Sequence, residues 1–170
     1  SWLTKKQSAY PYDDVLGIRP ELRDLYRNFY GKLWDDELVP AKLLELCRLR
    51  IAQIHDCNAE WEVRHSEAKV SDEQIQKLQN WEGNQLFSPV EQAVLRFAEK
   101  MPWQHHEITD EDFETMRVHL SEPEVVALTV ACGLFDANCR LRIALAVKQG
   151  KKETKAPAIP DILSSSGVTI

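Results

Sequence analysis

Residues 45–68 read ELCRLRIAQIHDCNAEWEVRHSEA, and this stretch contains the most informative pattern of the chain. Apolar residues recur at helical spacing from residue 43 onwards. They are Leu43, Leu44, Cys47, Leu49, Ile51, Ala52 and Ile54. The pattern breaks at residues 55–58, HDCN, because Asp and Asn favour the starts of helices over their interiors. The sequence therefore predicts a helix that starts at Pro40, a break, and a second helix from about residue 58 towards residue 70.

Three side chains of this stretch are candidates for chemistry. Cys57 is expected at the start of the second helix, where the partial positive charge of the helix dipole favours a thiolate. Glu60 lies one turn further on. Glu45 has leucines around it, and burial would raise the pKa of its carboxyl group, which makes a proton carrier near neutral pH. The alternative is a surface Glu45 paired with Arg48, three residues further along the same helix.

The same stretch resembles the carboxymuconolactone decarboxylase and alkylhydroperoxidase D (AhpD)-like superfamily. That family carries a helical Glu, a Cys twelve positions later, a second site residue three positions after the Cys, and a His four positions further on. The corresponding residues here are Glu45, Cys57, Glu60 and Arg64. Weaker similarity continues through FSPVEQAVLRFAEKM and FDANCRLRIALAV, so the resemblance covers roughly residues 19–147. It implies an AhpD-like helical fold, usually assembled into trimers or hexamers with sites near the subunit contacts.

Two positions differ from the family pattern. The peroxidase branch uses Cys-x-x-Cys, and Glu60 replaces the second cysteine, so a disulfide within the motif is excluded. The decarboxylase branch tends to carry Glu at this position. Arg64 takes the place of the His, and the imidazole follows at His65. In a continuous helix residue 65 would lie about 80° around the axis from Cys57, so His65 could then serve the same pocket only if the helix were rotated or the site were shared with a neighbouring subunit.

Length and composition favour a single domain. The chain has 170 residues and a net charge of −6, with acidic and basic residues interspersed, so nothing indicates binding to nucleic acid. No apolar run reaches the length of about 18 residues needed for a membrane span, and the start lacks the apolar segment of a signal peptide. We therefore expect a cytoplasmic protein with no membrane partner.

The cysteines and histidines predict neither a disulfide framework nor a cofactor. The four cysteines, Cys47, Cys57, Cys132 and Cys139, lie in predicted helices or at a helix start, which fits reduced cytosolic thiols. We interpret all of them except Cys57 as small core residues. No Cys-x-x-Cys pair occurs and the histidines lack ligand spacing, so neither zinc nor another cofactor is expected.

The rest of the chain predicts further helices. Pro20 starts one that runs to about residue 34. Its expected apolar face consists of Leu22, Leu25, Tyr26, Phe29, Tyr30 and Leu33. Capping signatures begin four more helices, at Ser71, Ser88, Thr109 and Ser121. The last is apolar on nearly all sides, as expected for a central helix or a subunit contact. No stretch alternates like a strand, so we predict an all-α fold with six to eight helices.

The predicted helical domain spans residues 19–149. An irregular N-terminal arm, residues 1–18, precedes it. The C-terminal tail, residues 150–170, has no helical period, and we expect it to pack on a neighbouring subunit.

Polar residues outside the motif offer secondary candidates. Asp136, Asn138 and Arg140 interrupt the last helix, and the simplest expectation is an ion pair between Asp136 and Arg140. The bolder alternative is that Arg140 binds a substrate carboxylate. The connector WQHHEIT carries His105 and His106, which point in different directions. Either could serve as a reserve acid/base group, and His105 is our candidate for substrate binding.

Three functions remain in competition. The first is a cofactor-independent decarboxylation or isomerisation of a lactone or related organic acid, in which Glu60 or His65 supplies a proton, Arg64 orients the anionic substrate and Glu45 completes a relay. The second is peroxidase-type thiol chemistry at Cys57, with a resolving thiol from Cys47, another subunit or an external thiol. The third is an oligomeric binding protein that has lost the chemistry.

Overall fold

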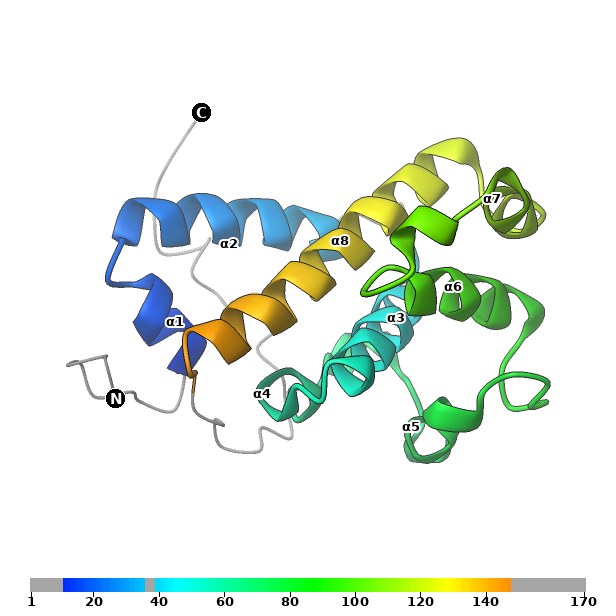
Figure 1. Ribbon diagram of the computed structural model, residues 1–170, viewed down its shortest axis with the longest axis horizontal. Helices are drawn as coiled ribbons and strands as arrows, with labels where there is room; N and C mark the ends of the chain where they lie inside the picture. Colours follow the sequence, from blue (N-terminus) through cyan, green and yellow to red (C-terminus); the bar gives the residue numbers. More distant parts are fainter. Residues whose placement is uncertain (1–10, 36–38, 148–170) are drawn as a thin grey trace.

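The computed structural model describes residues 11–35 and 39–147. Over these residues the chain forms eight α-helices and three short 3-10 helices without any strand, which confirms the all-α prediction (Figure 1). In chain order the elements are α1 (Pro11–Leu16), α2 (Pro20–Asp35), α3 (Ala41–Ile54), α4 (Asn58–Trp61), η1 (Ser66–Ala68), α5 (Asp72–Lys77), η2 (Leu78–Asn80), α6 (Pro89–Lys100), η3 (His105–Glu107), α7 (Asp110–Arg117) and α8 (Glu122–Ala144). None of the helices in this part of the chain is both long and apolar enough to cross a bilayer.

Helix α3 is the centre of the molecule. It packs against α6 on one side and α8 on another, and α8 crosses the front of the molecule in Figure 1. Its buried residues lie on all sides and include the two charged residues Glu45 and Arg48. The helix begins after Pro40 and ends before Asp56, whose φ of 50° turns the chain through the left-handed region. Because α3 is enclosed, its polar side chains must find partners inside the protein.

The second helix of the motif is much shorter than predicted. We expected it to run from residue 58 towards residue 70, but α4 stops at Trp61. The guanidinium of Arg48 donates to the carbonyl oxygens of Glu60 and Val63, at 2.7 Å each. The backbone N–H of His65 donates to the side chain of Glu45 at 3.1 Å. A longer helix would need these backbone groups for its own hydrogen bonds, so side chains of α3 end it.

The predicted starts of four later helices are confirmed. Ser71, Ser88, Thr109 and Ser121 each form a capping box with the residue three positions further on. At Ser88, for example, the hydroxyl accepts a hydrogen bond from the N–H of Glu91, and the Glu91 carboxylate accepts one from the N–H of Ser88 at 2.8 Å. Each of these four helix starts is therefore stabilised by hydrogen bonds between residues only three positions apart in the sequence.

The N-terminal segment differs from the prediction where it can be described. We expected residues 1–18 to be irregular, but residues 11–16 form α1, which packs beside α2. An ion pair between Asp13 and Arg27 of α2 holds it, and Tyr12 reaches Asn138 of α8. These long-range contacts, rather than a local apolar period, stabilise the helix. Residues 1–10 of the predicted arm and the predicted tail at 150–170 lie outside the described residues.

Two helices expose apolar residues that we expected to be buried. On α2, Tyr26, Tyr30 and Leu33 face the core. The other half of the predicted face is open, since Leu22, Leu25 and Phe29 are 53%, 68% and 52% exposed. Helix α8 buries one side and exposes Val126, Val130, Leu141 and Ile143. The enclosed helix is thus α3, and α8 covers it on one side only.

Candidate active site

A buried ion pair on α3 begins the candidate site. The carboxylate of Glu45 accepts two hydrogen bonds from the guanidinium of Arg48, each 2.7 Å long, and a third from the N–H of His65. Both side chains are at most 2% exposed. Burial alone would raise the pKa of Glu45, but the charge and the hydrogen bonds of Arg48 outweigh it, so this pKa lies below its ordinary value. The predicted pairing with Arg48 is confirmed, but it lies in the interior and not on the surface.

Glu60 extends this pair into a chain of alternating charges. One of its carboxylate oxygens lies 3.1 Å from Nη1 of Arg48, and the other lies 2.5 Å from Nε of Arg142 on α8. We call Glu45, Arg48, Glu60 and Arg142 the charged cluster. Two carboxylates and two guanidiniums balance each other, which offsets the cost of placing four charges in the core.

His65 lies beside the charged cluster, while its neighbour Arg64 does not. Since the helix ends at Trp61, the chain is extended at His65, and its ring stacks on Trp34 at 3.6 Å with planes 7° apart. Burial lowers the pKa of His65 to about 4, so the imidazole is neutral near pH 7. The half-buried Arg64 instead donates to the carbonyls of Trp61 and Val63 and lies over the Trp61 ring. Our reasoning from helical angles did not apply here, because the helix does not reach these residues.

Cys57 is buried beside a second cysteine. It precedes α4 and is 2% exposed. Its Sγ lies 3.9 Å from the carbonyl oxygen of Cys139 on α8. That contact with Cys139 lowers the pKa of Cys57 below its ordinary value, although burial opposes the effect. We predicted a low pKa from a helix dipole, but the four residues of α4 make a weak dipole, and the neighbouring thiol is the larger cause.

Helices α1 and α2 add hydroxyl groups at the α8 side of the site. Asn138 accepts hydrogen bonds through Oδ1 from Tyr26 at 2.8 Å and from Tyr12 at 3.3 Å. The guanidinium of Arg142 lies 4.1 Å from the centre of the Tyr12 ring. Burial raises the pKa of Tyr12 to about 12, so its hydroxyl keeps its proton near pH 7. Tyr12 therefore covers Arg142 from the α1 side.

The structure brings together the four residues predicted to be catalytic. Glu45, Glu60 and His65 are linked through Arg48 and the backbone of residue 65, and the N–H of Glu60 donates to the carbonyl of Cys57 at 3.0 Å. Their catalytic roles stay predictions.

Sequence analysis missed Arg142 on α8 and interpreted Cys139 only as a core residue, because neither a cation nor a cysteine is unusual in a helix. Asn138 was noted as a polar residue that interrupts an apolar helix, but its tyrosine partners were not predicted.

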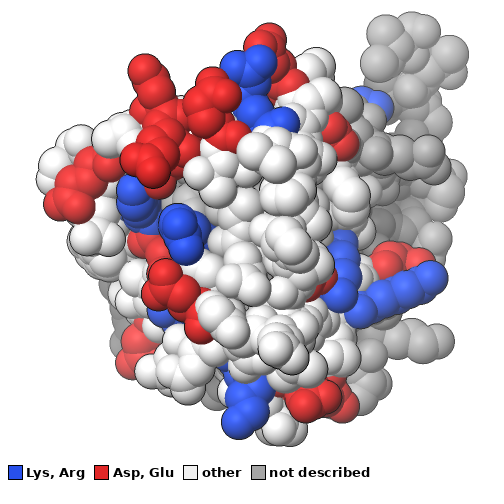
Figure 2. Space-filling model, turned by 90° about the vertical axis from the view of Figure 1, so that its right-hand side faces the viewer, with Lys and Arg blue, Asp and Glu red and all other residues white. Residues whose placement is uncertain are grey.

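The secondary candidates lie elsewhere. Asp136 pairs with Arg140 at 2.9 Å, as predicted, and also with His55 at 2.6 Å. His105 lies on η3, exposed, with its ring against that of His106. On the α7 side of the molecule, acidic and basic residues are interspersed around uncharged surface (Figure 2).

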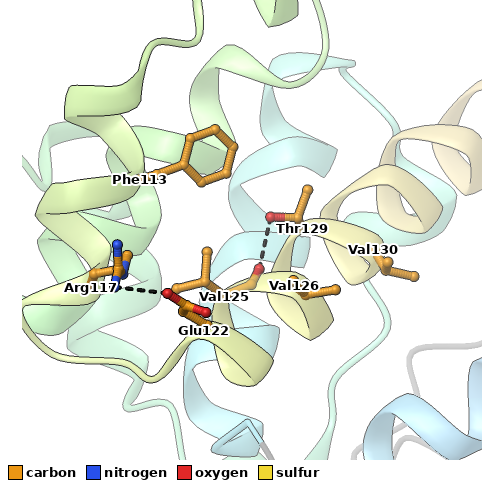
Figure 3. Close-up of a pocket in the computed structure, with 7 residues that line it drawn as sticks. All are labelled: Phe113, Arg117, Glu122, Val125, Val126, Thr129 and Val130. Carbon is orange, nitrogen blue, oxygen red and sulfur yellow. Dashed lines mark hydrogen bonds and ion pairs between the residues drawn. The ribbon is translucent and has the colours of Figure 1, made fainter.

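A groove between α7 and α8 is separate from the charged cluster. Its volume is about 390 Å³, and its lining comprises Phe113, Arg117, Glu122, Val125, Val126, Thr129 and Val130 (Figure 3). Its two charged residues, Arg117 and Glu122, pair with each other at 2.9 Å. Thr129 precedes Arg142, the residue of the charged cluster on α8, by thirteen residues, which places the groove roughly 20 Å from the cluster along the helix axis. Among the described residues, no group of three or more His, Cys, Asp or Glu side chains is placed to hold a metal ion.

Comparison with known proteins agrees with the motif. No curated protein matches the chain. The model of the carboxymuconolactone decarboxylase family matches residues 20–100, from the first residue of α2 to the last of α6. The matched segment contains Glu45, Arg48, Cys57, Glu60 and His65, and it ends before α8, which supplies the rest of the site. Residues 20–100, slightly less than half of the chain, are thus similar to the carboxymuconolactone decarboxylase family.

Proposed function

We propose that the chain is a cofactor-independent enzyme that catalyses decarboxylation or isomerisation of a lactone or a related small organic acid. One observation carries the proposal, the neutral imidazole of His65 next to the charged cluster. A buried neutral imidazole can take a proton from a carbon acid and return it, and nearby guanidiniums stabilise the negative charge that develops.

The contacts divide the roles among the residues. Glu45 and Glu60 are each bound by guanidinium groups, so they are better suited to position positive charge than to carry a proton. His65 is the proton carrier. Arg142 has a side chain that is 15% exposed, against 1% for Arg48, so it is the guanidinium that an entering carboxylate meets first. This role had been predicted for Arg64.

Substrate entry requires movement of α1. Tyr12 lies on Arg142 and is itself buried, so a bound acid must displace this ring. α1 is six residues long and is tied down by the ion pair between Asp13 and Arg27 and by the hydrogen bond from Tyr12 to Asn138. Few contacts need to break, which suits a segment that opens during turnover.

The test is a turnover assay over a panel of lactone acids. We expect His65→Gln to lower kcat by about 100-fold or more, the usual contribution of a positioned acid/base group. His119→Gln, at an exposed position just after the end of α7, serves as the matched control and leaves kcat unchanged. If Cys57→Ser abolishes turnover while His65→Gln and Glu60→Gln do not, acid/base catalysis is wrong.

We further propose that the chain assembles with copies of itself. The supporting observation is the stripe on and just before α2 formed by Ile18, Leu22, Leu25 and Phe29, all more than half exposed. These residues are spaced by four, three and four positions and so lie on one side of the helix. Contiguous exposed apolar surface of this kind is typical of a contact between subunits.

A further inference from the structure

One buried N–H group beside the candidate site has no acceptor inside the protein. Among the described residues, three buried side-chain polar atoms lack a hydrogen-bond partner, namely Nε1 of Trp34, Oε2 of Glu60 and Nε of Arg142. The atoms of Glu60 and Arg142 nevertheless form an ion pair with each other at 2.5 Å, so their charges are compensated. The indole N–H of Trp34 has no such compensation. Because a buried N–H without an acceptor costs free energy, a ligand that accepts from it would be stabilised here.

His65 adds two more polar atoms at the same place. Its ring lies face to face with the ring of Trp34, with centres 3.6 Å apart and planes 7° apart. The hydrogen bonds of His65 run through its backbone, to Glu45 and Ala68, and neither ring nitrogen bonds to a residue that the structure describes. Neutral imidazole has one nitrogen that donates and one that accepts. The stacked rings therefore present a neutral donor and a base, both without partners in the described part of the chain.

Aromatic neighbours fix the orientation of the indole. Tyr30, one turn earlier on α2, lies edge-on to Trp34 with ring centres 6.2 Å apart, and Phe135 of α8 packs at 5.9 Å. The hydroxyl of Tyr30 lies near the indole, but the two groups do not meet the geometry of a hydrogen bond. A donor that is held in place before a ligand arrives binds it at a lower cost in entropy. Trp34 is thus a preorganised donor next to the proposed proton carrier.

We propose that the indole N–H of Trp34 binds the carbonyl oxygen of the substrate, on the carbon next to the one from which His65 takes a proton. This inference rests on the acid/base function proposed above and narrows its substrate class to acids with an enolisable carbonyl group. The two acceptors of such an acid have separate donors. Its carboxylate meets the charged guanidinium of Arg142, and its uncharged carbonyl meets the uncharged indole.

The proton transfer consumes no further reactant. The C–H bond beside the carbonyl breaks, the proton goes to the accepting ring nitrogen of His65, and the electron pair shifts to the carbonyl oxygen, which becomes an enolate. The hydrogen bond from Trp34 strengthens as this oxygen gains negative charge, so it favours the enolate over the ground state. Return of the proton to another carbon of a conjugated enolate gives an isomer. Trp34 would therefore be a catalytic residue that touches the reacting group.

The experiment compares two ligands that differ in one carbonyl oxygen. The first is a saturated five-membered lactone that carries an acetic acid group, and the second is the corresponding cyclic ether acid. Binding of each ligand to the wild type and to Trp34→Phe is measured by isothermal titration calorimetry. Trp81→Phe is the matched control, because Trp81 is buried and its indole N–H already donates to Glu99 at 2.7 Å.

The expected result is a loss of affinity for one ligand only. Trp34→Phe should bind the lactone acid about fivefold more weakly, the usual value of one uncharged hydrogen bond, and should bind the ether acid as the wild type does. Trp81→Phe should change neither affinity.

The wild-type protein gives an independent readout by NMR. Its five tryptophans give indole signals in a proton–nitrogen correlation spectrum. The Trp34 signal is assigned by its loss in Trp34→Phe or by its contacts with the His65 ring. It should move downfield when the lactone acid is added and stay in place with the ether acid. This titration decides the matter even where a variant does not fold.

Several results would overturn the proposal. They are a wild type that does not bind the lactone acid at millimolar concentration, and a loss of affinity in Trp34→Phe that is absent or equal for the two ligands. A third is an upfield move of the Trp34 signal in ligand-free Tyr30→Phe, which would show that Tyr30 already accepts the hydrogen bond. These measurements follow binding and not turnover. A normal kcat in His65→Gln would therefore contradict the acid/base function while leaving the carbonyl contact of Trp34 to be judged by the two ligands.

Discussion

Arg48 holds the carboxylate of Glu45 through two parallel hydrogen bonds of 2.7 Å while the same guanidinium donates to two backbone carbonyls beyond Cys57. A single side chain of α3 thus neutralises a buried acid and fixes the path of the chain from residue 60 to residue 65. The fixed path places His65 next to Glu45. Arg48 is therefore expected to be essential for the folded structure of the site.

Replacement of Arg48 tests this expectation directly. We expect Arg48→Met to lower the free energy of unfolding by about 3–5 kcal/mol, because Glu45 would be left as an unpaired buried carboxylate and Glu60 would keep only its ion pair with Arg142. The control is Arg117→Met, whose ion pairs with Glu114 and Glu122 are on the surface, with a cost of about 0–1 kcal/mol. Urea denaturation of both variants gives the comparison. Equal losses would show that the buried pair is not stabilising the fold.

The low pKa of His65 predicts a dependence of stability on pH. His65 has a pKa of about 4 in the folded protein and an ordinary value of 6.5 when unfolded. Between these values the unfolded chain binds a proton that the folded chain does not, so stability falls as the pH decreases from 6.5 to 4. The loss amounts to about 3 kcal/mol. His65→Gln should flatten the profile in this window, and His119→Gln should leave it unchanged.

Glu45 acts in a lower pH window. Its folded pKa lies below the ordinary value of 4.5, so its contribution to stability is present above pH 4.5 and is lost as the pH falls through the folded value. His65→Gln should therefore retain the steep loss of stability below pH 4.5. Denaturation at a series of pH values distinguishes the two residues, and a His65→Gln profile that is flat down to pH 3 would contradict the assignment.

Asn138 should contribute more to stability than either of its partners. Asn138→Ala leaves the buried hydroxyls of Tyr12 and Tyr26 without their acceptor, at a cost of about 2–4 kcal/mol. Tyr26→Phe removes one hydrogen bond and leaves the other in place, at a cost of about 1 kcal/mol. Thermal or urea unfolding measures both. A cost for Asn138→Ala no greater than that of Tyr26→Phe would mean that the hydroxyls find other partners.

Removal of the Tyr12 ring should open the site. In Tyr12→Ala, α1 loses its contacts with Asn138 and Arg142, so we expect Cys57 to react with iodoacetamide several-fold faster than in the wild type. Cys47, which is buried under α6, should not change. Peptide mapping after brief alkylation gives the rates. Equal acceleration at both cysteines would indicate general loosening of the core rather than movement of α1.

The exposed stripe on α2 predicts a change of assembly. Leu25→Glu places a charge at its most exposed position, and we expect it to shift the molar mass measured by light scattering towards that of a single chain. Lys32→Glu, at an exposed polar position on the same helix, is the control. An unchanged mass in Leu25→Glu would place the contact elsewhere or show that the wild type is monomeric.

Local sequence predicted most of the helices but not the detail of the site. The capping residues Ser71, Ser88, Thr109 and Ser121 gave correct helix starts, because each interacts with residues within one turn. The predicted end of this second motif helix was wrong, because the end of α4 is set by Arg48, which lies on another helix.

The same distinction explains the site residues. The spacing of Glu45, Cys57 and Glu60 was informative because the three residues lie in one continuous stretch of sequence. Cys139 and Arg142 depend on how α8 packs across the motif, and nothing in their own neighbourhood indicates that contact.

The capping boxes have a consequence for local opening. Helices α5 to α8 carry their own start signals, whereas the segment from α4 to η1 is held by side chains from distant elements. Amide protons between residues 58 and 68 should therefore exchange with solvent deuterium faster than those of α6, even where both are equally covered. Residues 58–68 would then open and close independently, while α5 to α8 stay folded.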